Sequence, residues 1–173
     1  MAVKSALSKV VGFPNPVNEV ASRMVAAVVV LACVAAIVFG EPWILLPLAY
    51  GFWARTITGP TLSPLGMLAS RVVAPRLAKE RPVAGPPKRF AQAMGTAFST
   101  TAVVLWFGFG LHTAAWVVIG LLGAAAFFEA AFRFCLGCRI FGLLMRAGII
   151  PEEVCAECAN ITLRHPELVG PAS

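Results

Sequence analysis

Four of the five cysteines in this chain form two C-x-x-C pairs. The first pair is Cys135 and Cys138, and sixteen residues separate it from the second, Cys155 and Cys158. Two such pairs can supply the four thiolates of a tetrahedral zinc site, and the spacing fits sites of this kind. One pair alone can instead close a disulfide and exchange it with another thiol. The two pairs are therefore the candidate functional residues.

Three interpretations of the pairs remain open from the sequence. In a redox or sulfur relay, Cys135 and Cys138 are the catalytic pair, and Cys155 and Cys158 exchange with them. In a zinc site all four bind the metal, and the chain is a zinc-stabilised membrane scaffold or partner subunit without catalysis. In the third interpretation the cysteines are small residues at a helix interface. Whether the chain is an enzyme stays open at this point.

The composition indicates that lipid is the solvent of this protein. Of the 173 residues, 59% are hydrophobic and only 13% are charged, and the mean hydropathy is +0.83. A soluble domain carries about 25% charged residues. The net charge of +6 does not require nucleic acid as a partner, because basic residues also orient membrane proteins.

The apolar runs predict an all-α, polytopic membrane protein with four transmembrane helices. The second run is short and is interrupted by Pro47. Leu65, Leu68 and Val72 recur at helical spacing in the basic loop and predict a helix on the membrane surface. Short helices are expected in the C-terminal segment. The boundaries are an N-terminus at 1–17, spans at about 20–39, 42–57, 90–110 and 114–134 within a membrane domain at 18–134, a basic loop at 58–89, and a cysteine-bearing segment at 135–173.

The distribution of positive charge predicts the orientation of the spans. The turn at 40–42 carries only Glu41, and the turn at 109–113 carries no lysine or arginine, so all fourteen basic residues fall toward the other side. The positive-inside rule then places both termini, the basic loop and both cysteine pairs in the cytoplasm. Thiols are normally reduced there, so a cytoplasmic thioredoxin- or rhodanese-like protein would be the partner of a thiol relay.

Polar and small residues within the spans suggest helix contacts. Glu129, near the end of the fourth span, is expected to pair with Arg133 one turn later, and Glu19 with Arg23 in the first span. Gln92 and Thr96 are expected to bond to a neighbouring helix or to their own backbone. In a third function class, a small-solute transporter, they would line a path. A stripe of small residues in the first span could support a homo-oligomer.

Several short segments resemble one family of bacterial membrane proteins, the domain of unknown function 4395, over residues 13–146. The family usually has Asp-Pro-Arg where this chain has Asn15-Pro16-Val17. The resemblance implies a small four-helix protein of the bacterial cytoplasmic (inner) membrane, and it supplies no activity. The segments are Asn15-Pro16, Ser63-Pro64-Leu65-Gly66, Ala74-Pro75-Arg76-Leu77, Pro86-Pro87-Lys88-Arg89-Phe90-Ala91-Gln92 and Cys135-Leu136-Gly137-Cys138.

Overall fold

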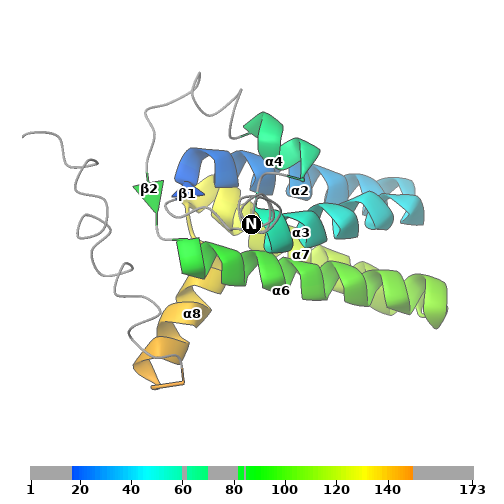
Figure 1. Cartoon of the computed structure of the whole chain (residues 1–173). Coiled ribbons are helices and arrows are strands. Elements are labelled where there is room, and N and C mark those ends of the chain that lie inside the picture. The colour runs from blue at the N-terminus through cyan, green and yellow to red at the C-terminus, as the bar shows by residue number, and fades with distance from the viewer. Residues whose placement is uncertain (1–16, 60–61, 70–81, 84, 150–173) are drawn as a thin grey trace, which may run out of the picture.

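The protein is a bundle of helices in a computed structural model, which describes residues 17–59, 62–69, 82–83 and 85–149 (Figure 1). The helices are α2 (Glu19–Phe39), α3 (Leu45–Thr58), α4 (Pro64–Leu68), α6 (Gly85–Val103), α7 (His112–Phe132) and α8 (Leu136–Arg146). A 3-10 turn, η1 (Pro42–Ile44), precedes α3, and a π-helical turn, η3 (Val104–Gly108), continues α6. Two short antiparallel strands, β1 (Val17–Asn18) and β2 (Pro82–Val83), pair Val17 with Val83.

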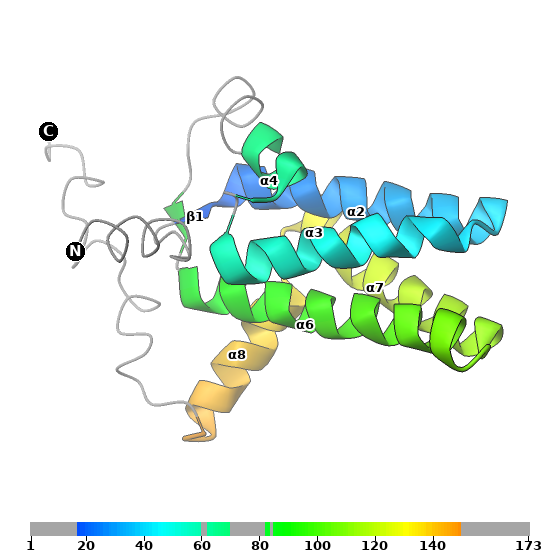
Figure 2. The same ribbon diagram turned by 45° about the vertical axis from the view of Figure 1, so that its right-hand side comes forward.

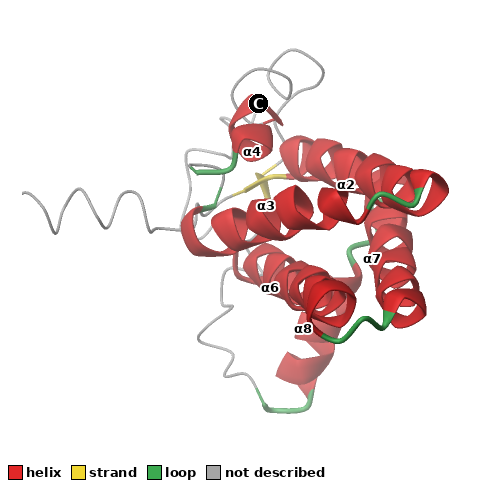
Figure 3. Ribbon diagram, turned by 90° about the vertical axis from the view of Figure 1, so that its right-hand side faces the viewer, coloured by secondary structure: helices red, strands yellow, loops and turns green. Residues whose placement is uncertain are grey.

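Four of these helices, α2, α3, α6 and α7, run side by side (Figures 1 and 3). Helix α2 packs mainly on α7, α3 packs mainly on α6, and α6 also contacts α7 and α8. Helix α8 packs on α6 at one end and points obliquely away from the bundle (Figure 2). This end holds the starts of α2 and α6 and the ends of α3 and α7. We call it the basic end, because Arg23, Lys88 and Arg89 lie there. The opposite end, with the turns at 40–44 and 109–111, is the turn end.

Three helices are long and apolar enough to cross a membrane. They are Glu19–Phe39, Gly85–Gly108 and His112–Phe132, with mean hydropathies of 2.5, 1.2 and 1.9. Three of the four predicted spans are thereby confirmed as helices of suitable length. Helix α3 has 14 residues, which is about 21 Å at 1.5 Å per residue. It is shorter than the ~30 Å hydrocarbon core, so length alone does not make it a fourth span.

Large apolar side chains cover much of the outer surface of the bundle. Leu31 is 68% exposed, Val38 is 71% exposed and Phe39 is 75% exposed. A water-soluble helix would turn such residues toward a core. Their outward position is consistent with contact with a lipid bilayer.

Local signals explain where the helices begin. The side chain of Asn18 accepts a hydrogen bond from the Val20 amide at 2.9 Å and caps α2. Helix α6 begins at Gly85, five residues before the predicted start of the third span. Pro86 and Pro87 lie in its first turn, where proline is tolerated because those amides have no partner within the helix. Lys88 therefore belongs to the helix and not to the predicted basic loop.

The polar face of α6 is used to bind α3. Thr96 and Thr56 share a hydroxyl hydrogen bond of 2.8 Å, and the Trp53 indole donates to Thr100 at 3.0 Å. Ser99 is fully buried and donates to the backbone carbonyl of Gly95 at 2.8 Å. These bonds confirm the prediction that polar groups in this span bond to a neighbouring helix or to their own backbone.

Small residues permit the closest helix contacts. A Cβ atom on Gly95 would fall inside the ring of Phe52 on α3, and one on Gly123 of α7 would lie 3.1 Å from the Cβ of Cys33 on α2. Cys33 is 1% exposed, so it is a small residue buried between the helices. Glycine at these two positions lets α3 approach α6 and α2 approach α7.

The turn end is closed by aromatic rings. Trp106 stacks near His112 and Trp116, with ring centroids 4.2 and 4.7 Å apart, and Trp43 lies 5.5 Å from Phe107. Aromatic side chains favour the boundary between lipid and headgroups because their rings are amphipathic. This cluster suits a membrane interface.

Candidate functional site

The first cysteine pair begins α8 at the basic end. Helix α7 ends at Phe132, and Cys135 then adopts an extended backbone (φ −82°, ψ 106°) as the N-cap of α8. Its Sγ accepts a hydrogen bond from the backbone amide of Cys138 at 3.4 Å. Cys135 is 8% exposed and Cys138 is half-buried. The pair therefore spans the first turn of a helix, with Sγ of Cys135 at the positive end of the helix dipole.

The surroundings make the two thiols chemically unequal. The Cys138 thiol donates a hydrogen bond to Cys135 and thereby lowers the pKa of Cys135, and the charge of Lys88 acts in the same direction against burial and Glu129. The same hydrogen bond and burial raise the pKa of Cys138. Cys135 is therefore the residue that forms a thiolate, which is the reactive form of cysteine.

A buried ion pair lies beside these thiols. Lys88 Nζ on α6 contacts Glu129 Oε1 on α7 at 2.7 Å, with side chains 10% and 16% exposed. The prediction that Arg133 pairs with Glu129 was wrong. Arg133 adopts a left-handed backbone (φ 58°) that ends α7, so it is exposed and does not continue the helix one turn beyond Glu129.

Arg23 also has a partner other than the one predicted. Its guanidinium donates from Nε and Nη2 to the backbone carbonyl of Ala130 at 3.1 and 2.7 Å, rather than binding Glu19. The last carbonyls of a helix have no partner within the helix and carry partial negative charge. Arg23 thus joins the start of α2 to the end of α7.

Gly137, within the first cysteine pair, allows α8 to contact α6. A Cβ atom at this position would lie 2.6 Å from both Cα and Cβ of Ala91. The rings of Phe90 and Phe141 meet beside this point with centroids 5.7 Å apart. Segment 86–92 and segment 135–138, which are distant in the sequence and both support the family resemblance, are therefore packed together.

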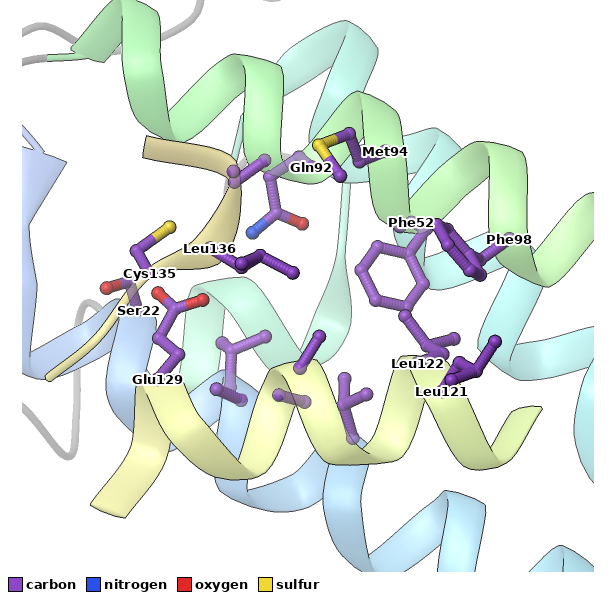
Figure 4. A pocket seen from close by; sticks show the side chains of 18 residues that line it. Ser22, Phe52, Gln92, Met94, Phe98, Leu121, Leu122, Glu129, Cys135 and Leu136 are labelled. Carbon is purple, nitrogen blue, oxygen red and sulfur yellow. The ribbon is translucent and has the colours of Figure 1, made fainter. Parts of the chain in front are cut away.

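A cavity of about 210 Å³ lies next to the pair, between α2, α3, α6 and α7. Figure 4 shows Cys135, Ser22 and Glu129 close together at one end and Phe52, Phe98 and Leu122 toward the other. The cavity is thus polar near the thiols and apolar deeper in the bundle.

Zinc binding by all four cysteines stays a prediction. Cys155 and Cys158 lie outside the described residues. Within the part of the chain that the structure describes, no cluster of three or more histidine, cysteine, aspartate or glutamate side chains could hold a metal ion. Of the four predicted ligands, Cys135 and Cys138 are the two that the structure describes.

The sequence analysis missed one charged neighbour of the thiols and one buried cation elsewhere in the bundle. Lys88 was assigned to a loop, although Pro86 and Pro87 before it are a signal for a helix start. Arg55 lies near the end of the short second run, and it is 6% exposed inside the bundle. Its partner, Gln92, lies 37 residues away, so no local pattern could have shown the contact.

The comparisons with known proteins agree with the resemblance seen in the sequence. A family model described as "Domain of unknown function (DUF4395)" matches residues 17–146, which are 130 of the 173 residues. No curated protein and no solved structure matches the chain. The match includes the buried ion pair, the first cysteine pair and all helices from α2 to α8. The chain therefore belongs to the domain of unknown function 4395 family.

Proposed function

We propose that this protein is a membrane-embedded thiol protein that exchanges disulfides through Cys135 and Cys138. The observation that supports this most is the position of Cys135 at the N-cap of α8, where its Sγ accepts from the Cys138 amide. A C-x-x-C pair at a helix start favours one thiolate and keeps a second thiol within reach. Lys88 adds a positive charge beside the first thiol.

The proposed exchange has two balanced steps. The Cys135 thiolate attacks a disulfide of a partner protein, a mixed disulfide forms, and one partner sulfur leaves as a thiolate. Cys138 then gives its proton to that thiolate and attacks Cys135 Sγ, which releases the second partner sulfur. The pair is oxidised to a disulfide, and the partner gains the two electrons. A thioredoxin-like dithiol reverses both steps, and Cys155 and Cys158 are proposed to pass electrons to the first pair.

The proposed topology has four spans, with both termini in the cytoplasm. Helix α3 and η1 together cover 42–58, and α3 bonds to the polar face of α6 within the bundle. The described turns at the turn end carry no lysine or arginine, whereas the basic end holds Arg23, Lys88 and Arg89. This asymmetry supports a cytoplasmic basic end and cytoplasmic segments at 1–17, 58–89 and 135–173.

Thiol counting on the full-length protein tests the function. Protein purified anaerobically in detergent is equilibrated in glutathione redox buffers, and free thiols are counted by maleimide labelling. With Cys155 and Cys158 replaced by serine, we expect one reversible disulfide that is lost in Cys135→Ser and in Cys138→Ser and is retained in Cys33→Ser. A pair that stays reduced in every buffer would contradict the proposal.

Metal analysis of the same sample separates the zinc scaffold from the thiol relay. Stoichiometric zinc that protects all four thiols, and is lost in Cys155→Ser, would replace redox exchange with a structural metal site. The Cys138→Ser variant gives a further test, since it should accumulate a mixed disulfide with a thioredoxin-like protein. If that adduct is absent and zinc is bound, the scaffold would be the function that remains.

A further inference from the structure

Arg55 is a buried cation whose hydrogen bonds are incomplete. It lies on α3, about one turn before the helix ends, and is 6% exposed. Its Nε donates to Gln92 Oε1 at 3.0 Å, and its Cζ lies 4.6 Å from the centre of the Phe52 ring. Its Nη2 is buried and has no hydrogen-bond partner among the residues that the structure describes. A buried donor without an acceptor is rare and indicates an absent partner.

The charges around Arg55 leave one positive charge unbalanced. Glu129 pairs directly with Lys88 and also attracts Arg55 from a distance, so two cations share one carboxylate. The direct contacts of Arg55 are to the neutral side chains of Gln92 and Phe52. Arg23 binds a carbonyl of α7. An uncompensated charge in a low-dielectric interior is unfavourable. An anion at Nη2 would supply both the missing acceptor and the missing charge.

Arg55 lines a groove that could receive such an anion. The groove, of about 280 Å³, lies between α2, α3 and the start of α4. Away from the guanidinium its wall is largely apolar and includes Val28, Ala32 and Leu48. Val28 is 39% exposed on the outer face of the bundle, so the groove borders the region where lipid would lie. A groove with one cation and an otherwise apolar wall is complementary to an amphiphile, which combines a charged headgroup with an apolar chain.

We propose that this groove binds an anionic phospholipid. The guanidinium of Arg55 turns toward the groove so that the phosphate accepts from Nη2, and the first part of one acyl chain lies along Val28 and Ala32. A headgroup with a net charge of −1 balances the unpaired guanidinium. A zwitterionic headgroup brings its own cation and leaves the total charge unchanged. The apolar wall favours a lipid over a soluble anion. The site is independent of thiol exchange.

Lipid titrations on the full-length protein in detergent test the site. Native mass spectrometry measures the affinity for dioleoylphosphatidylglycerol and for dioleoylphosphatidylcholine. Because the choline cation of the zwitterionic lipid offsets the charge of its phosphate, we expect roughly tenfold tighter binding of the anionic lipid. Arg55→Gln should abolish this preference. Arg89→Gln, which removes the same charge from an exposed position on α6, should keep it.

A second variant tests the groove without altering charge. Ala32→Phe fills the apolar wall and should weaken anionic lipid binding, while Cys135→Ser should leave it unchanged. Equal affinity for the two lipids in the wild type would overturn the proposal even if Arg55→Gln failed to fold. So would a preference that survives both Arg55→Gln and Ala32→Phe. Tighter binding of oleate, or displacement of the lipid by inorganic phosphate, would assign the groove to a fatty acid or a free anion instead.

Discussion

The helices end in different ways at the two ends of the bundle. At the turn end, short turns with left-handed glycines at Gly40 and Gly110 reverse the chain, and aromatic rings cover them. At the basic end, side chains from distant segments are joined by charge. Lys88 binds Glu129 across 41 residues, and Arg23 binds Ala130 across 107.

The turn end therefore has a structural role, whereas the basic end carries the groups proposed to react. The turn end uses short turns and contacts between aromatic rings, which tolerate substitution because few buried polar groups depend on them. The basic end places a cation and a carboxylate beside two thiols. Removing one member of this buried ion pair leaves the other member without a partner. We therefore expect mutations at the basic end to have the larger effects on stability and on thiol chemistry.

The largest effect is expected from Glu129→Gln. The carboxamide cannot balance the charge of Lys88, and a buried ion left without its partner costs about 3–5 kcal/mol. Reversible unfolding in mixed micelles would measure the loss. The matched control, Glu41→Gln, removes an exposed carboxylate at the turn end and should change stability little. Similar losses in the two variants would contradict the comparison between the ends.

A double variant sharpens the same comparison. Replacing Lys88 by Met and Glu129 by Leu removes both charges, and apolar replacements of a buried pair are often neutral for stability. Stability should therefore recover most of the way toward the wild type. The midpoint of Cys135 alkylation should move to slightly lower pH, because Glu129 raises the pKa of Cys135 more than Lys88 lowers it. A double variant as unstable as Glu129→Gln would show that the pair contributes more than charge neutralisation.

The next effect is expected from Gly137→Ala. The added methyl group meets the backbone of Ala91, and overpacking of this kind costs about 1–3 kcal/mol. Because Cys135 begins the same helix, its alkylation rate should change as well. Gly142→Ala is the matched control in α8, since a Cβ there meets nothing within 4 Å, and it should be neutral or stabilising by up to about 1 kcal/mol. Equal effects of both would contradict the proposed α6–α8 contact.

A smaller, pH-dependent effect separates the two thiols. The pKa of Cys135 is lowered, so its thiolate persists to lower pH, and its alkylation by iodoacetamide should decline only as the pH falls through that lowered value. The pKa of Cys138 is raised, so its alkylation begins only at higher pH. In variants that retain one pair, with Cys33, Cys155 and Cys158 replaced, Cys135 should react at least roughly tenfold faster near neutral pH. Equal midpoints would exclude the proposed asymmetry.

The smallest effect is expected at the turn end. Trp106→Leu removes the ring contacts with His112 and Trp116, and such aromatic pairs contribute about 0.5–1.5 kcal/mol. The variant should melt slightly earlier with an unchanged pH profile of Cys135. A shift in that profile would mean that the two ends are coupled, contrary to the local contacts described here.

The sequence was sufficient to predict long apolar helices and their approximate boundaries, because hydropathy over about 20 residues is a direct signal of a span. It also indicated that the polar side chains of α6 bond to a neighbouring helix or to their own backbone. It failed for Glu129, because helical spacing suggested Arg133, and only the left-handed end of α7 rules that pairing out. The unpaired state of Arg55 and the contact of Gly137 with Ala91 depend on how distant helices pack, which local periodicity does not encode.

The Lys88–Glu129 pair also has a consequence for the order of events during synthesis. Lys88 leaves the ribosome 41 residues before Glu129, a delay of roughly 2–8 s at ordinary elongation rates. During that time the helix that carries Lys88 enters the bilayer with a cation that has no carboxylate to bind. Release from the insertion machinery should therefore wait for α7, and a nascent chain stalled before Glu129 should remain bound to insertase or be degraded.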